Sequence, residues 1–195
     1  MNRRDEGVDI ASTVTYGGAH IARSYQKWTS LYPAEQKVLA HYRKQARGRV
    51  LDIAVGAGRT TRHLAPAAAH YIGVDLSDSM IRRAQQAFPG ADLRVMDMRN
   101  VPDGLPGQNF DLVLISFNSL DYIPWNDRID LLGRLRMLLS ESGVLIVSSH
   151  SLECLERRPV RFRPPSKARP LASQLFSDPM EFAKRSLRLA DWLLR

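Results

Sequence analysis

Cysteine is nearly missing from this sequence of 195 residues, and its scarcity limits the chemistry to be expected. Cys154 is the only cysteine, so no disulfide can form within the chain. Clusters of residues at metal-ligand spacing are not apparent either. We therefore expect no metal site and no magnesium-assisted chemistry.

Long apolar runs are also missing. No stretch approaches the ~20 apolar residues that a membrane-spanning helix needs. The amino-terminal arginines, Arg3 and Arg4, are not followed by an apolar segment, which excludes a typical secretory signal. The length corresponds to one domain and the composition is ordinary, so a cytoplasmic protein is predicted.

Charge is unevenly distributed along the chain, whose formal net charge is +8. Residues 151–195 hold 10 basic and 5 acidic residues, and 157–170 combine basic residues with four prolines. This run is either a solvated linker or a phosphate-binding stretch. Residues 178–195 show the pattern of a helix with an apolar face. We expect this face to pack on its own domain, on a second copy in a homodimer, or on a membrane surface.

The most informative segment, residues 50–65, reads VLDIAVGAGRTTRHLA. It predicts a short strand, a turn of small residues over 54–58, and a helix from Arg59. Such a corner binds ligands in doubly wound sheets, because glycine lets a ligand lie against the backbone. A third glycine of the dinucleotide fingerprint is lacking, since Thr61 or Arg59 stands at its place. Ala54 should avoid the left-handed region, where alanine is strained.

Four further apolar strands are predicted after the glycine turn, over residues 70–76, 91–95, 110–115 and 143–148, with helices between them. Asp75 ends the second strand, nineteen positions after Gly56, the spacing that places a carboxylate on a ribose diol. Ser77 is the predicted N-cap of the next helix. The helix over 126–139 is expected to bury the following side chains: Ile129, Leu132, Leu135, Met137 and Leu139.

The pattern D-x-A-x-G-x-G from Asp52 to Gly58 resembles motif I of the class I S-adenosylmethionine-dependent methyltransferases, with Ala54 replacing the usual first glycine. Asp75 and Asp97, each after its own strand, match the acids that contact ribose and adenine in that family. The resemblance implies S-adenosyl-L-methionine as cofactor. It assigns cofactor contacts to Asp52, Ala54, Gly56, Gly58, Asp75, Leu76, Met80, Asp97, Met98 and Ser116.

The implied fold is α/β, a doubly wound, mainly parallel Rossmann-like sheet of about five strands. Residues 1–47 are expected to form a helical segment and residues 48–150 the cofactor-binding core. Tyr16 and Tyr25 of the first segment either cover the cofactor as part of a lid or pack on the core. Residues 151–195 would form a basic, proline-rich linker and a helix. The family's usual C-terminal β-hairpin is missing or diverged there, which would leave strand five at an edge.

The predicted activity is methyl transfer to an oxygen or nitrogen atom of a small molecule. Asp121 and His150 are weak candidates for a catalytic base, and the base is otherwise unknown. Nucleic acid is not expected as a substrate, because Ser116-Phe117-Asn118-Ser119 replaces the D/N-P-P-Y/F motif. The alternatives are a shortened, non-catalytic S-adenosylmethionine-binding or scaffold relative and, less favoured, an aminopropyl transferase.

Overall fold

The computed structural model of the protein describes residues 23, 27, 29–105 and 109–150. The chain divides into two compact units, residues 1–148 and 149–195. The expectations for Tyr16, Tyr25, the basic proline-rich run, the C-terminal helix and the missing hairpin lie outside the described residues.

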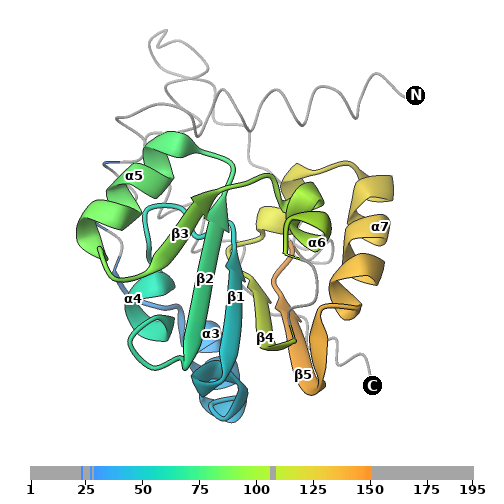
Figure 1. The fold of residues 1–195 in the computed structure, drawn as a ribbon, viewed down its shortest axis with the longest axis horizontal. Coiled ribbons are helices and arrows are strands. Elements are labelled where there is room, and N and C mark those ends of the chain that lie inside the picture. Colours follow the sequence, from blue (N-terminus) through green and yellow to red (C-terminus); the bar gives the residue numbers. More distant parts are fainter. Residues whose placement is uncertain (1–22, 24–26, 28, 106–108, 151–195) are drawn as a thin grey trace, which may run out of the picture. The chain divides into compact units, whose positions relative to one another are not determined.

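The central element is a five-stranded parallel sheet in the order β3-β2-β1-β4-β5 (Figure 1). The strands are β1 (Arg49–Ile53), β2 (His70–Asp75), β3 (Asp92–Val95), β4 (Phe110–Ile115) and β5 (Leu139–Val147). β1 and β4 are almost wholly buried, as strands covered on both faces of a parallel sheet should be. The predicted doubly wound Rossmann-like fold is confirmed.

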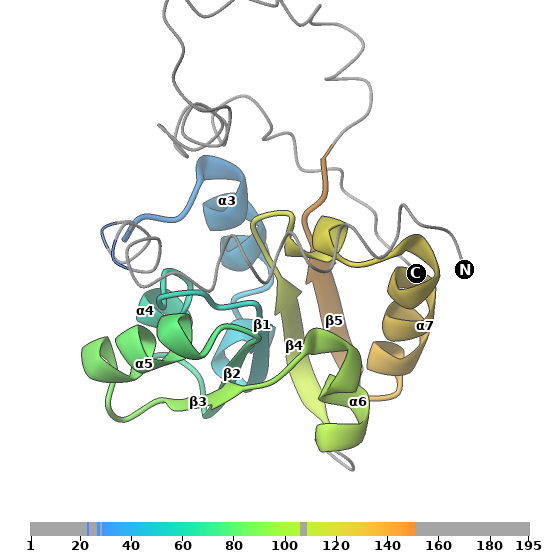
Figure 2. The ribbon, with the colours of Figure 1, turned by 90° about the horizontal axis from the view of Figure 1, so that it is seen from above.

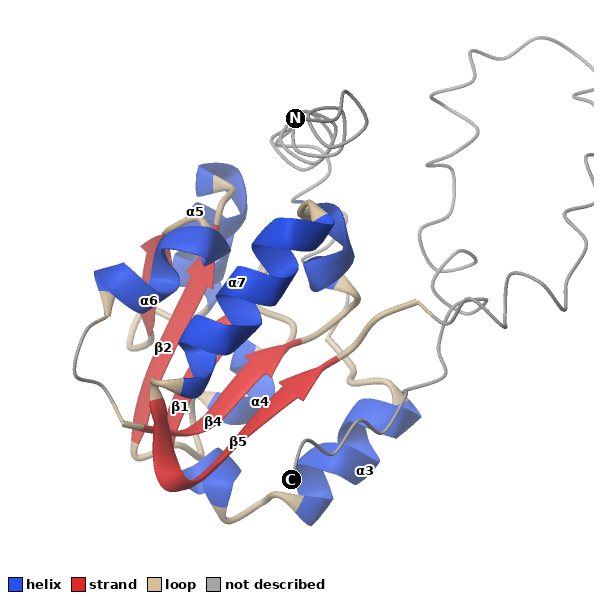
Figure 3. Ribbon diagram, turned by 90° about the vertical axis from the view of Figure 1, so that its right-hand side faces the viewer, coloured by secondary structure: helices blue, strands red, loops and turns tan. Residues whose placement is uncertain are grey.

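Helices cover both faces of the sheet (Figure 2). On one side lie α3 (Pro33–His41), η1 (Gln45–Arg47), α4 (Thr61–Leu64) and α5 (Asp78–Ala87). On the other lie α6 (Val101–Gly104), η3 (Ser119–Tyr122) and α7 (Trp125–Arg136), with η2 (Met98–Asn100) leading into α6 (Figure 3). Each face has its own apolar core, because alternate residues of β1 and β4 point to opposite sides.

The predicted buried face of α7 was partly wrong. Leu131 and Leu135 are buried, but Ile129 is 55 % and Met137 is 82 % exposed. Leu139 does not belong to the helix, because it already pairs with Phe110 at the start of β5. The helix ends at Arg136, earlier than predicted, so the expected apolar stripe wrongly included residues that follow the helix.

β5 begins four residues before the predicted strand. Its pairing with β4 is interrupted by a register shift between Phe110 and Leu112. Gly143 lies in this irregular part, where a Cβ would come within 2.5 Å of the Phe110 carbonyl oxygen. Among the described residues β5 pairs only with β4, so it forms an edge of the described sheet.

The turn after β1 differs from the expectation at Ala54, which adopts a left-handed backbone with φ 61°. Gly56 and Gly58 also have positive φ, at 56° and 93°. An alanine in this region is strained by about 1–2 kcal/mol. Alanine prefers a negative φ, but packing of β1 on one side of the turn and of the following segment on the other imposes the left-handed conformation on Ala54.

Ala54→Gly is expected to stabilise the protein by about 0.5–1 kcal/mol, since relief of the strain exceeds the entropy that glycine adds to the unfolded chain. Chemical denaturation measures the change. Ala57→Gly is the matched control, because Ala57 lies in the same turn without a positive φ and should lose stability. Equal destabilisation by both substitutions would contradict the strain at Ala54.

Candidate cofactor site

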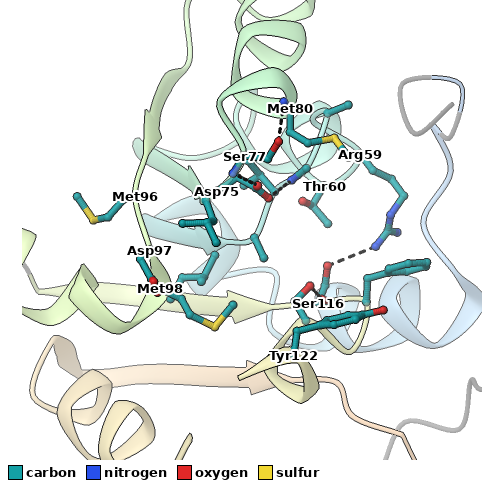
Figure 4. Close-up of a pocket in the computed structure, with 18 of the residues that line it drawn as sticks. Arg59, Thr60, Asp75, Ser77, Met80, Met96, Asp97, Met98, Ser116 and Tyr122 are labelled. Carbon is teal, nitrogen blue, oxygen red and sulfur yellow. Dashed lines mark hydrogen bonds between the residues drawn. The ribbon is translucent and has the colours of Figure 1, made fainter. Parts of the chain in front are cut away.

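The pocket of interest has a volume of about 400 Å³ and lies where β1, β2, β3 and β4 end (Figure 4). The chain order reverses between β1 and β4, and ligands of doubly wound sheets bind at such a point. The volume falls in the range of small-molecule sites. The pocket thus stands where the sequence predicts the cofactor.

Most of the residues assigned from the sequence share this pocket. Those in its lining are Ala54, Gly56, Asp75, Leu76, Met80, Asp97, Met98 and Ser116. Asp52, Gly58 and Asp121 are not in the lining. His150 belongs to the second compact unit, so its suggested role as a base stays a prediction.

Asp75 connects the glycine turn to the loop after β2. Its Oδ2 accepts a hydrogen bond from the Gly56 N–H at 2.8 Å, and its Oδ1 accepts one from the Ser77 N–H at 2.8 Å. Burial raises the pKa of Asp75, although both backbone donors oppose the shift. A carboxylate has about four acceptor sites, so two remain for hydroxyl groups of a ligand.

The two glycines of the turn have different roles. A Cβ at Gly56 would meet nothing within 4 Å, and the residue lines the pocket, so the missing side chain leaves room for a ligand. A Cβ at Gly58 would instead lie 2.6 Å from Cε2 of Phe88. Gly58 is therefore needed where the turn packs against the end of α5. It is not among the residues that line the pocket, so its predicted contact with the cofactor stays a prediction.

Asp52 lies behind the turn with no solvent exposure. Its Oδ2 accepts a hydrogen bond from the Tyr71 hydroxyl at 2.8 Å, and Tyr71 in turn accepts one from Thr61 at 2.8 Å. Oδ1 of Asp52 has no hydrogen-bond partner among the described residues. Burial raises the pKa of this carboxyl to about 6, with the hydrogen bonds acting against the shift. The acid thus links β1 to β2 and, through Tyr71, to the start of α4.

Asp52→Asn is expected to change how stability depends on pH. Because burial raises the pKa of Asp52 in the folded state, its contribution to stability is largest near pH 4 and declines as pH rises through about 6. The limiting slope is about 1.4 kcal/mol per pH unit. The stability of the variant relative to wild type should therefore rise from pH 4 to 7 in urea titrations. Asp92→Asn, at an exposed ion pair, is the control, and a pH-independent difference would contradict the prediction.

The far end of the pocket carries the predicted adenine contacts. Asp97 accepts hydrogen bonds from the backbone N–H of Arg99, at 2.9 Å, and from the Arg99 side chain. Burial of Asp97 acts to raise its pKa, but the bonds and charge of Arg99 outweigh it and hold the pKa below its ordinary value. Leu76 and Met98 line the same end, and Leu76 is 46 % exposed. An exposed leucine in a pocket is suited to cover an aromatic ring.

The loop after β4 forms the opposite wall. Phe117 and Asn118 both have φ 58°, a left-handed conformation that asparagine tolerates and that is strained for phenylalanine. The Asn118 N–H donates to the Ser148 hydroxyl at 2.8 Å, a bond that ties the loop to the end of β5. Consecutive left-handed residues turn the chain sharply, and the Phe117 ring is brought to the pocket.

Asp121 is held by Arg128 rather than placed in the pocket lining. Arg128 donates to the carbonyl oxygens of Asp121 and Ile123 at 2.7 and 2.8 Å, and its Nη1 lies 3.6 Å from the Asp121 carboxylate. These contacts brace η3, which carries Tyr122 into the pocket. The arrangement favours a structural role for Asp121 over the suggested role as a base.

Sequence reasoning missed Glu35 and Arg59, which form a buried ion pair beside the pocket. Glu35 lies on α3, and Arg59 ends the glycine turn. A cation at the start of a helix opposes the helix dipole, and that unfavourable placement was the available signal at Arg59. The sequence around Glu35 gives no sign of this ion pair, because α3 approaches the glycine turn only in the folded chain.

Comparison with known proteins agrees with this geometry. Residues 50–143 match the family model of a methyltransferase domain. The chain is 32 % identical over 131 residues to "Putative methyltransferase YqeM" of Bacillus subtilis (strain 168), an alignment that covers 65 % of this chain and 49 % of the relative. The chain thus spans about half the length of the curated relatives it matches.

Solved structures show the same fold. CalS10, an amino pentose methyltransferase from Micromonospora echinaspora bound to S-adenosylmethionine, superposes with a TM-score of 0.56 at 23 % identity, covering 69 % of this chain and 57 % of CalS10. An S-adenosylmethionine-dependent methyltransferase from Mesorhizobium loti superposes with a TM-score of 0.51 at 27 % identity, covering 60 % of this chain and 54 % of that protein. Residues 50–143 therefore belong to a methyltransferase-domain family, as the resemblance to the class I S-adenosylmethionine-dependent methyltransferases predicts.

None of the helices in the described part of the chain combines the length and the hydropathy that crossing a bilayer requires.

Proposed function

We propose that this protein transfers a methyl group from S-adenosylmethionine to a small-molecule acceptor. The observation that carries the proposal is the pair formed by Gly56 and Asp75. The glycine leaves open space above the turn, and the carboxylate that fixes the turn retains acceptor sites beside that space. The residues present therefore suit an S-adenosyl ligand.

In this proposal each end of the pocket holds one part of the cofactor. Asp75 accepts hydrogen bonds from the ribose hydroxyls, while Leu76 and Met98 cover the adenine ring beside Asp97. Ala54, Gly56 and Ser116 line the other end, where the amino-acid part would lie. Met80 lines the pocket from α5, and Asp52 acts from behind the turn through its hydrogen bond with Tyr71.

The chemical demand on the protein is small. S-adenosylmethionine supplies a methyl group that its sulfonium already makes electrophilic. The protein then has to orient the acceptor and exclude water, which apolar and aromatic side chains do well. Phe117, Tyr122 and Ile123 line the pocket after β4 and are our candidates for that task.

A small-molecule acceptor is supported by two observations. The β4 exit lacks the prolines of enzymes that methylate flipped bases, and two left-handed residues shape it instead. CalS10, which shares the fold, is an amino pentose methyltransferase. The acceptor atom, oxygen or nitrogen, is left open in this proposal.

Calorimetry with S-adenosylmethionine, S-adenosylhomocysteine and NAD tests cofactor binding. We expect binding of both S-adenosyl ligands and none of NAD, because the third glycine of the dinucleotide fingerprint is lacking. Tight binding of NAD without heat from either S-adenosyl ligand would overturn the proposal. Turnover on a panel of small hydroxyl and amine acceptors then separates an enzyme from a non-catalytic relative.

A further inference from the structure

A buried cation stands in the wall of the pocket. The Arg59 guanidinium forms two parallel hydrogen bonds to the Glu35 carboxylate, with Nη1 to Oε2 at 2.6 Å and Nη2 to Oε1 at 2.7 Å. The side chains are only 11 % and 7 % exposed, respectively. The Tyr32 N–H also donates to Oε2 of Glu35 at 2.8 Å, so three of the about four acceptor sites of this carboxylate are occupied.

Two aromatic rings lie beside the guanidinium. The carbon atom at its centre lies 5.4 Å from the ring centroid of Tyr32 and 5.4 Å from that of Phe117. The two rings stack on each other with centroids 6.0 Å apart and an interplanar angle of 21°. Phe117 has a left-handed backbone at the β4 exit, with φ 58°.

The guanidinium keeps donors for a second partner. Arginine has five N–H donors, and the two bonds to Glu35 use one edge of the fork. On the other edge, Nη2 donates to the Ser116 hydroxyl at a long 3.3 Å, and Nε has no hydrogen-bond partner among the described residues. Arg59 and Ser116 both line the pocket, and Figure 4 shows Arg59 reaching toward Ser116 across the wall.

We propose that Arg59 is a specificity-determining residue that binds the carboxylate at the amino-acid end of an S-adenosyl ligand, and that Glu35 positions it. The inference rests on the proposed function and deepens it. The open Nε/Nη2 edge matches a carboxylate in a bidentate arrangement, which a lysine ammonium cannot reproduce. An S-adenosyl ligand without the carboxylate, the donor for aminopropyl transfer, would leave that edge unpaired.

The test compares two ligands that differ only in this carboxylate, S-adenosylmethionine and decarboxylated S-adenosylmethionine. Wild type should bind the first about 10- to 100-fold more tightly in calorimetry, as expected for hydrogen bonds between charged groups. In Arg59→Met the preference should fall below about 3-fold, because the planar donor is gone.

Two further variants keep the test decisive. The double substitution Glu35→Gln with Arg59→Met removes both buried charges and should fold, and it too should lose the preference. Arg62→Met is the matched control, since Arg62 stacks on Phe88 at 5.4 Å outside the pocket lining and should keep the wild-type preference.

The outcomes separate the two proposals. If wild type binds neither ligand, the proposed function fails. If wild type binds both ligands equally, or if the folded Arg59 variants keep the wild-type preference, the inference about Arg59 is overturned while the proposed function stands.

Discussion

Glu35→Ala is expected to lower the free energy of unfolding by about 3–5 kcal/mol, because it leaves the buried Arg59 guanidinium without its counter-charge. The substitution also removes the acceptor of the Tyr32 N–H, which belongs to the capping box of α3. Denaturant unfolding, with circular dichroism as the readout, measures the loss. The effect is large because both side chains are almost buried, so the Arg59 charge is only partly solvated once its partner is gone.

Asp78→Ala is the matched control for Glu35→Ala. Asp78 also pairs with an arginine, Arg82, but the two side chains are 54 % and 69 % exposed. An exposed pair contributes about 0–1 kcal/mol. The double variant Glu35→Ala with Arg59→Met should recover much of the loss. Similar costs for Glu35→Ala and Asp78→Ala would contradict a stabilising role for the buried pair.

Asp75→Ala is expected to weaken binding of S-adenosylmethionine by roughly 2–4 kcal/mol, or about 30- to 1,000-fold in Kd. Two hydrogen bonds from the ribose hydroxyls to a carboxylate are lost. The Gly56 and Ser77 N–H groups also lose their acceptor, so the glycine turn is less well fixed. Calorimetry on the folded variant gives the affinity, and a thermal melt reports how much of the fold survives.

Asp92→Ala provides the reference for Asp75→Ala. Asp92 is an exposed residue at the start of β3, paired with Arg94 and outside the pocket lining, so its loss should leave the affinity unchanged. An unchanged affinity in folded Asp75→Ala would show that the ribose lies elsewhere.

Local pattern was sufficient to predict the strands and the position of the pocket. The apolar runs predicted β1 to β4 to within a residue or two. The signal is clearest for β1 and β4, because the central strands of a parallel sheet are buried on both faces. The N-cap Ser77 was confirmed, since its side chain accepts a hydrogen bond from the Met80 N–H. Asp75 and Gly56 meet as the spacing predicts, because neighbouring parallel strands end side by side.

Sequence pattern failed where a residue's environment comes from a distant segment. Ala54 was expected to avoid the left-handed region, but packing on both sides of the turn overrides that local preference. Ile129 and Met137 were assigned to the core although they face outward, because a short apolar pattern fits more than one helical face.

The sequence by itself determined the fold class, the place of the glycine turn, and the strands on or after which Asp52, Asp75 and Asp97 lie. These features depend on spacing along the chain, which fixes where adjacent strands begin and end. Only the tertiary structure decided that Asp52 lies behind the turn and that Glu35 holds Arg59 beside two stacked rings. Burial and ion pairing depend on which segments meet in space, and 24 residues separate Glu35 from Arg59 along the chain.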